Sequence, residues 1–117
     1  YHPTKKYDLI ISISTLEHVG WDEDPRDPGK VIRAFENLLK LLSPGGKIAI
    51  TLPLSYNPEI DKYLMEGRLR FDKQYYLKRI SRSNKWIETT WDDVCGAKYG
   101  KPFPNANALV IGFAERK

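Results

Sequence analysis

The chain has 117 residues, of which 41% are hydrophobic and 29% are charged, with a net charge of +4. This composition is that of one globular domain and excludes a disordered chain, and no apolar stretch reaches the roughly 18 residues of a membrane span. A single cysteine, Cys95, excludes an internal disulfide and a multi-cysteine metal site. Because the N-terminus has no signal-peptide pattern, we expect a cytoplasmic protein with one domain over residues 1–117.

The first half of the chain predicts a strand, a helix and a second strand. Residues 7–14 form an apolar, β-branched run, which is typical of a parallel strand covered on both faces. A helix then opens at Asp27 or Pro28 and carries one broad apolar stripe. A Ser-Pro-Gly-Gly turn at 43–46 ends the helix and leads into a strand at 47–53. The short connections predict a βαβ unit with parallel strands and a right-handed crossover.

The second half predicts shorter elements. We expect a helix at 58–65, a short strand at 85–90, a capped helical turn at 90–94 and a closing strand at 108–114. Residues 71–80 fit a helix and a strand equally well. The alternation of strands and helices predicts an α/β fold.

One hydrophobic core should join the first three elements, because both strands are apolar on two sides and the helix has one apolar stripe. Its expected members are Leu9, Ile11, Ile13, Phe35, Leu38, Leu42, Ile48, Ile50 and Leu52.

Basic and aromatic residues are interleaved between positions 62 and 86. The basic ones are Arg68, Arg70, Lys73, Lys78, Arg79, Arg82 and Lys85, and the aromatic ones are Tyr63, Phe71, Tyr75, Tyr76 and Trp86. Such interleaving occurs in nucleic-acid-binding modules. The alternative is a solvated face whose aromatic side chains turn inward, and the small net charge favours this alternative. A non-catalytic α/β interaction domain is a further possibility.

Several other polar residues are expected to be structural or solvated. Asp22, Glu23, Asp24 and Asp27 lie in an acidic loop that lacks the spacing of a calcium site, so no metal site is predicted. Asp8 begins its strand, His2 lies in a polar terminal segment, and Cys95 has no neighbouring histidine to activate it.

Four stretches of the first half carry a family resemblance. They are Tyr-Asp-Leu-Ile-Ile-Ser at 7–12, Leu-Glu-His-Val at 16–19, Leu-Leu-Ser-Pro-Gly-Gly-Lys-Ile at 41–48 and Thr-Leu-Pro at 51–53. Together they resemble the class I S-adenosylmethionine-dependent methyltransferases, over about residues 7–54. The resemblance implies a Rossmann-like sheet in which 7–14 is the fourth strand, 47–53 is the fifth and 108–114 is an antiparallel last strand.

The resemblance also implies a site at the end of the first strand and methyl transfer to an unidentified acceptor. Ligands of open α/β sheets bind at the carboxyl ends of the strands, where Glu17 and His18 would lie. His18 would accept a proton, since imidazole exchanges protons near neutral pH, and Glu17 would orient the substrate or the positive charge of the cofactor. The alternative is that both side chains only bond to loop backbone. The implied cofactor-binding residues are Ser14, Thr15 and Leu16. The implied substrate-binding residues are Trp21, Tyr56 and Asn57.

Two parts of the family pattern are absent from the sequence. It lacks the glycine-rich loop that receives the methionine part of S-adenosylmethionine and the acidic residue that holds the ribose hydroxyls, and Gly45-Gly46 does not replace the loop. The chain, which does not begin with Met, therefore looks like the C-terminal half of such an enzyme, with weak cofactor binding or none. The strand at 7–14 would then lack a neighbour, so we expect a homodimer through 7–14 and the helix at 30–42.

Overall fold

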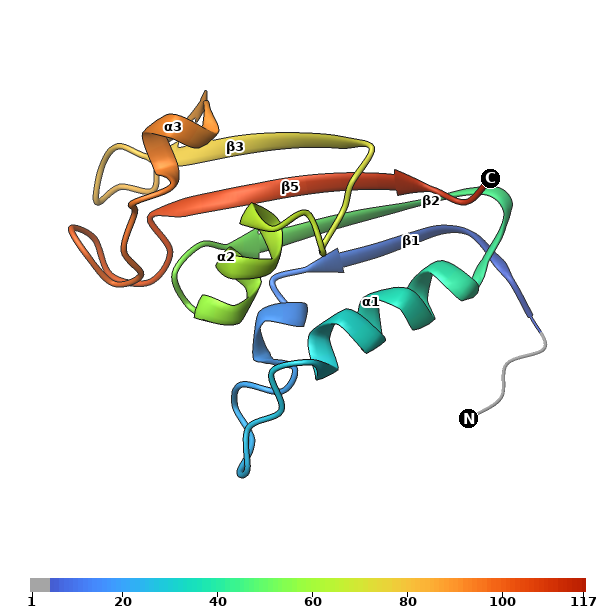
Figure 1. Cartoon of the computed structure of the whole chain (residues 1–117). Coiled ribbons are helices and arrows are strands. Elements are labelled where there is room, and N and C mark those ends of the chain that lie inside the picture. Colours follow the sequence, from blue (N-terminus) through green and yellow to red (C-terminus); the bar gives the residue numbers. More distant parts are fainter. Residues whose placement is uncertain (1–4) are drawn as a thin grey trace.

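The computed structural model describes residues 5–117, so the expectation for His2 lies outside the described residues. In chain order the elements are β1 (Tyr7–Ile13), the short 3₁₀ helix η1 (Leu16–His18), α1 (Lys30–Lys40), β2 (Leu42–Pro53), α2 (Pro58–Met65), β3 (Lys73–Arg79), β4 (Trp86–Thr89), α3 (Trp91–Val94) and β5 (Ala108–Glu115). The strands form one five-stranded mixed sheet in the order β1-β2-β5-β3-β4 (Figure 1). The α/β class is therefore confirmed.

The predicted strand-helix-strand unit is present, with β1 and β2 side by side and parallel. Leu9 is the neighbour of Lys47 and Ile13 is the neighbour of Thr51. Helix α1 connects the two strands and buries Val31 and Phe35, which belong to its predicted apolar stripe.

The predicted end of the helix and start of the second strand are shifted. Helix α1 ends at Lys40, and β2 already begins at Leu42, which pairs with Tyr7. The glycine-containing turn at 43–46 is a bulge within β2, because the pairing resumes only at Leu9 and Lys47. Gly46 fits this bulge because a Cβ there would lie 2.9 Å from the Tyr7 carbonyl oxygen.

The last strand runs antiparallel between two others. β5 pairs antiparallel with β2 on one side and with β3 on the other. The segment that fitted both a helix and a strand is thus a strand, because β5 offers it an edge to pair with. β4 then pairs antiparallel with β3 and completes the sheet.

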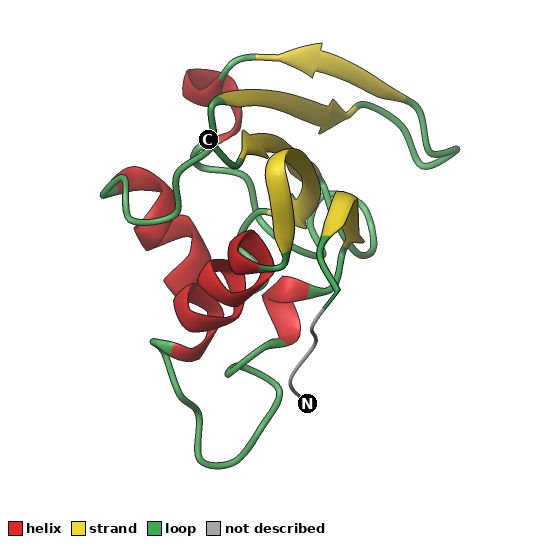
Figure 2. Cartoon of the chain, turned by 90° about the vertical axis from the view of Figure 1, so that its right-hand side faces the viewer, coloured by secondary structure: helices red, strands yellow, loops and turns green. Residues whose placement is uncertain are grey.

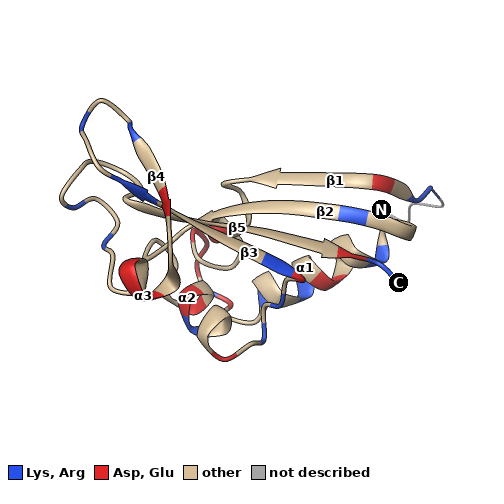
Figure 3. Cartoon of the chain, turned by 90° about the horizontal axis from the view of Figure 1, so that it is seen from above, with Lys and Arg blue, Asp and Glu red and all other residues tan. Residues whose placement is uncertain are grey.

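All of the helices lie on one face of the sheet (Figures 2 and 3). Ile48, Ile50 and Leu52 point toward the helices and are fully buried, and Phe35 and Leu42 join them in the core. Leu38 is partly buried against this core. These predicted core positions are confirmed.

Three predicted core residues are wrong. Leu9, Ile11 and Ile13 are 59%, 60% and 66% exposed. They occupy the odd-numbered positions of β1, and successive side chains of a strand point to opposite faces. Their face of the sheet carries no second layer among residues 5–117, so the expectation of a strand covered on both sides fails there.

None of the helices formed by residues 5–117 has the length and apolarity to cross a membrane.

Candidate functional site

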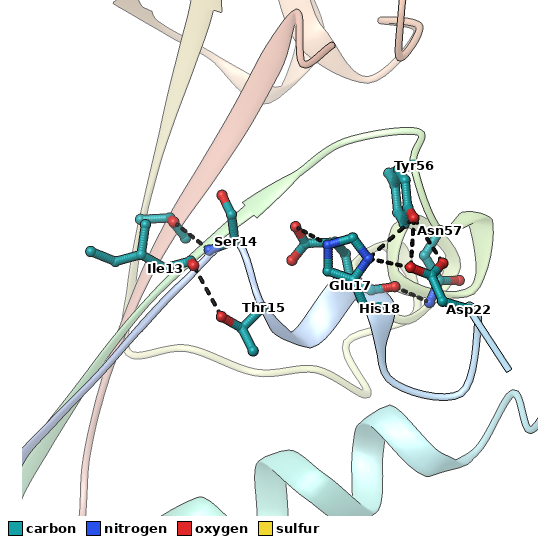
Figure 4. A network of polar contacts seen from close by, with 9 residues as sticks. Ile13, Ser14, Thr15, Glu17, His18, Asp22, Tyr56 and Asn57 are labelled. Carbon is teal, nitrogen blue, oxygen red and sulfur yellow. Dashed lines mark hydrogen bonds and ion pairs between the residues drawn. The ribbon is translucent and has the colours of Figure 1, made fainter.

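The chain segments that leave β1 and β2 meet at one edge of the sheet, where Figure 4 shows their polar side chains. Ser14 donates its N–H to the Thr51 carbonyl at 3.0 Å, which holds the end of β1 on β2. The ring of His18, just beyond β1, packs edge-on against the ring of Tyr56, just beyond β2, with 4.9 Å between their centroids. The residues that follow these two parallel strands therefore lie at the same edge of the sheet.

His18, Asp22 and Tyr56 form a hydrogen-bonded triad. His18 Nδ1 lies 2.5 Å from Asp22 Oδ2 and 3.1 Å from the Tyr56 hydroxyl. The Tyr56 hydroxyl donates to Asp22, with oxygen separations of 2.7 and 2.9 Å. The turn after η1 brings Asp22 to His18, because the Asp22 N–H bonds to the His18 carbonyl at 3.1 Å. The side chains of His18 and Tyr56, from two strand ends, thus share the carboxylate of Asp22.

The carboxylate of Asp22 determines the electrostatics of the triad. Hydrogen bonds from Tyr56 and then from His18 lower the pKa of Asp22, so this group is ionised. In turn the hydrogen bond to Asp22 raises the pKa of Tyr56 to about 12, so the phenol keeps its proton. An ionised Asp22 requires a proton on His18 Nδ1, which leaves Nε2 as the acceptor of a neutral imidazole.

Glu17 places a buried carboxylate beside that acceptor nitrogen. Its Oε2 is 3.6 Å from His18 Nε2, and only 3% of the residue is exposed. Its Oε1 is buried without a hydrogen-bond partner in the structure. Burial raises the pKa of Glu17, against the opposing effects of its own backbone N–H and of His18. Glu17 therefore has an unused acceptor where a cation or a hydrogen-bond donor would be stabilised.

Asn57 connects the two halves of the site. Its side-chain oxygen accepts the Glu59 N–H at 3.0 Å and caps α2, and its amide group donates to the Glu17 carbonyl at 3.1 Å. Asn57 is 3% exposed, so these bonds are made inside the protein. Its amide group is thus occupied in holding η1 against the start of α2.

The remaining predicted site residues have different surroundings. Ser14 and Thr15 are exposed at the end of β1, whereas Leu16 is 4% exposed and belongs to the hydrophobic core. Arg26 stacks on the ring of Trp21 with its guanidinium carbon 3.6 Å from the ring centroid. Trp21 and Asn57 line one small pocket, which does not include Tyr56.

Sequence reasoning missed two members of this site. Asp22 was expected to be part of a solvated loop, but it pairs with His18, and its spacing of four residues from that histidine is the signal that could have found it. Tyr99, from the segment between α3 and β5, packs edge-on against Tyr56 with centroids 5.0 Å apart. No local pattern in the sequence connects residues 56 and 99.

Two other acidic residues of the loop, Glu23 and Asp27, are engaged with helix α1. Glu23 accepts from Lys30 at 2.9 Å, and Asp27 forms an ion pair with Arg33. Within residues 5–117 no group of three or more His, Cys, Asp or Glu side chains is arranged to hold a metal ion.

The basic and aromatic segment has most of its rings turned inward. Tyr63 is buried in the core, and Phe71 and Tyr76 pack against it. Arg79 donates to the carbonyls of Ser81, Arg82 and Pro104, and Lys78 pairs with Asp93. Arg79 and Lys78 are thus engaged with other parts of the protein around β3.

The triad can take a proton from a bound group at His18 Nε2, and the carboxyl group of Glu17 lies 3.6 Å from that nitrogen. No protein-family model matches the chain, and a search of curated proteins finds no match.

Proposed function

We propose that this chain is the C-terminal half of a class I methyltransferase fold and that it takes part in methyl transfer from S-adenosylmethionine to a hydroxyl or amine acceptor. The observation that supports this best is the position of His18 and Asp22 just beyond the carboxyl end of β1, in contact with Tyr56 just beyond the parallel strand β2. The antiparallel last strand β5, lying against β2, agrees with the same fold.

In this proposal His18 is the general base. Asp22 holds the Nδ1 proton, and Nε2 accepts the proton of the acceptor as the new bond to carbon forms. Tyr56 keeps Asp22 in place through its hydroxyl, so it is a positioning residue. The His18 side chain is 49% exposed, which leaves its ring accessible to a substrate.

The residues present fit one end of S-adenosylmethionine. This compound supplies a methyl group on a positively charged sulfur, which needs no acid to leave. The unpartnered buried Oε1 of Glu17 is suited to a positive charge, and exposed Ser14 and Thr15 are beside it at the strand end. The sequence contains neither the glycine-rich loop nor the ribose-binding carboxylate of the family. The contacts to the methionine and ribose parts of the cofactor are therefore assigned to another segment of the longer protein.

The test uses the longer protein that the proposal requires, with release of S-adenosylhomocysteine in the presence of pooled metabolites as the readout. His18→Ala should lower turnover by about 100-fold, as for loss of a general base, and should change cofactor affinity much less. Lys85→Ala, in the turn before β4, is the control and should leave both values unchanged. If His18→Ala has normal turnover, His18 has only a structural role, and if the protein releases no S-adenosylhomocysteine, the methyl-transfer proposal fails.

A further inference from the structure

His18 Nε2 and the carboxyl group of Glu17 form a pair of adjacent hydrogen-bond acceptors. Oε2 of Glu17 lies 3.6 Å from Nε2, and Oε1 of Glu17 has no hydrogen-bond partner within residues 5–117. Figure 4 shows this carboxyl group on the Nε2 side of the imidazole ring, opposite Asp22. Because Glu17 is only 3% exposed, it is largely shielded from solvent. A group bound here therefore needs more than one donor to satisfy both side chains.

The number of donors distinguishes the acceptors that methyl transfer could use. A hydroxyl group has one O–H, so it can donate to Nε2 or to Glu17 but not to both. A protonated primary amine has three N–H donors and can bond to both at once. Its positive charge also opposes the effect of burial, which raises the pKa of Glu17, and so favours the ionised carboxylate.

The charges around the imidazole ring also suit a cation. Hydrogen bonds lower the pKa of Asp22, so a negative charge lies on the other side of the ring. The next two basic side chains along the chain are engaged with other groups, since Arg26 stacks on Trp21 and Lys30 pairs with Glu23. A cationic ligand is therefore favoured over an anionic one.

Tyr99 adds an aromatic surface next to these groups. Its ring packs edge-on against Tyr56 with 5.0 Å between the centroids, and the residue is 37% exposed. Besides the hydrogen bond to Asp22, the pKa of Tyr56 is raised by Tyr99 and by Glu17, so both lie near the Tyr56 hydroxyl. Tyrosine rings attract ammonium groups over their faces.

The loop that carries Tyr99 is held in a defined conformation. Lys98 and Lys101, on either side of the tyrosine, pair as a short antiparallel bridge. Asn107 is 4% exposed and donates to the Lys98 carbonyl at 3.2 Å. The fold thus presents Tyr99 beside Tyr56 in a fixed position.

We propose that the methyl acceptor is a primary amine, bound as its ammonium ion between His18, Glu17 and the ring of Tyr99. This inference rests on the proposed methyl transfer and narrows its acceptor atom to nitrogen.

In this arrangement one proton passes from the ammonium ion to Nε2, and the amine keeps the lone pair that attacks the methyl carbon. As the nitrogen–carbon bond forms, the carbon–sulfur bond breaks with its electron pair on sulfur, and the positive charge moves to the methylated nitrogen. The imidazolium ion lies between the carboxyl groups of Glu17 and Asp22 and returns its proton to solvent from its exposed ring.

The first test is a binding measurement on the 117-residue chain. Ethylammonium is the probe, and ethanol and propionate are the neutral and anionic probes of similar size. The NMR signals of the His18 ring should shift with ethylammonium and saturate with a Kd of roughly millimolar, which is near the limit for so small a ligand. Ethanol and propionate should leave these signals unchanged at the same concentrations. An equal shift with either of them, or no saturable shift with ethylammonium, would overturn the proposed site.

Variants assign this binding to the proposed residues. Glu17→Gln should weaken ethylammonium binding by about tenfold and Tyr99→Ala by about fivefold. Tyr99→Phe keeps the ring and should bind as the unaltered chain does. Lys98→Ala, in the same loop, is the control and should not weaken binding. With folding of each variant verified by thermal unfolding, normal binding by Tyr99→Ala or weakened binding by Lys98→Ala would contradict the assignment.

The second test identifies the methylated atom in the longer protein. S-adenosylmethionine with a carbon-13 methyl group is supplied with pooled metabolites, and the carbon chemical shift of the product distinguishes an N-methyl from an O-methyl group. An N-methyl product is expected, formed about fivefold more slowly by Tyr99→Ala at limiting metabolite concentrations and at the normal rate by Tyr99→Phe. An O-methyl product would overturn the amine and retain methyl transfer. The absence of any labelled product would instead remove the methyl-transfer proposal on which this inference rests.

Discussion

At the residue scale, one exposed carboxylate determines which nitrogen of His18 can react. Asp22 accepts from His18 Nδ1 and from the Tyr56 hydroxyl, so both neighbours keep their protons on the side that faces it. Glu17 lies on the other side of the ring, 3.6 Å from Nε2. The imidazole is thus held between an ionised carboxylate and a buried one whose pKa is raised.

The coupling between Asp22 and Tyr56 predicts a shift in tyrosine titration. Asp22→Ala removes the hydrogen bond that is the main cause of the high pKa of Tyr56, so this pKa should fall from about 12 toward 10. Spectrophotometric or NMR titration at alkaline pH measures it. The same substitution at Asp24, in the neighbouring loop, is the control. An unchanged Tyr56 pKa after Asp22→Ala would mean that the hydrogen bond is not formed in solution.

The buried carboxylate of Glu17 predicts a change of stability with pH. Since folding raises the pKa of Glu17, the folded state binds its proton more tightly than the unfolded state does. The free energy of unfolding should therefore fall as pH rises from about 4.3, the value of an unfolded glutamate, to the raised pKa, and stay level above it.

Glu17→Gln should remove this contribution, so that the variant gains stability over the native chain as pH rises through that window. Denaturant unfolding at a series of pH values measures the difference. Asp61, whose pKa burial also raises, contributes a slope of the same sign in both proteins and cancels in the comparison. Glu88→Gln, on β4, is the control for loss of a surface charge. A constant difference between the native chain and Glu17→Gln at all pH values would contradict the assignment.

At the element scale, β1 and β2 have similar apolar sequences but opposite surroundings. β2 lies inside the sheet, and its residues Ile48, Ile50 and Leu52 pack beneath the helices. β1 lies at the edge, and only its even-numbered side, with Ile10, reaches the core. Apolarity along a strand therefore does not establish that both of its sides are buried.

The same substitution on these two strands should have different effects. Ile50→Ala removes fully buried methyl groups and should lower the free energy of unfolding by about 2–5 kcal/mol. Ile11→Ala, at a residue that is 60% exposed, should change it by less than about 0.5 kcal/mol in dilute solution. Denaturant unfolding of the two variants measures both values. Equal losses would mean that the outer face of β1 is covered.

At the scale of the whole molecule, the sheet has helices on one face and an apolar second face. Tyr75 and Phe113 are each 40% exposed on that second face and pack edge-on, with centroids 5.9 Å apart. Together with Leu9, Ile11 and Ile13 they form an apolar surface larger than scattered single residues would produce. This surface extends to β1, an edge strand of the sheet formed by residues 5–117.

The proposed half-domain predicts weak cofactor binding by the chain itself. Calorimetric titration with S-adenosylmethionine should give no binding at micromolar concentrations, because the sequence offers no glycine-rich loop for the methionine part and no carboxylate placed for the ribose. Titration of the His18→Ala variant with S-adenosylmethionine under the same conditions is the matched measurement. Micromolar binding would show that the cofactor site is complete in these residues and that the family alignment is wrong.

The sequence by itself determined the local elements and the order of the first half. Strand β1, helix α1 and strand β2 follow from apolar periodicity and from short connections that permit only a parallel pair. The meeting of His18 and Tyr56 follows as well, because adjacent parallel strands end at the same edge. These features depend on neighbours along the chain, and a single sequence contains that information.

Only the tertiary structure decided the features that depend on distant segments. Residues 73–79 became a strand because β5 supplied an edge, which their own side chains do not specify. Leu9, Ile11 and Ile13 are exposed because no layer covers their side of the sheet, although their apolar character predicted burial. Asp22 and Tyr99 reach the site through a turn and a loop whose paths depend on packing with the rest of the fold.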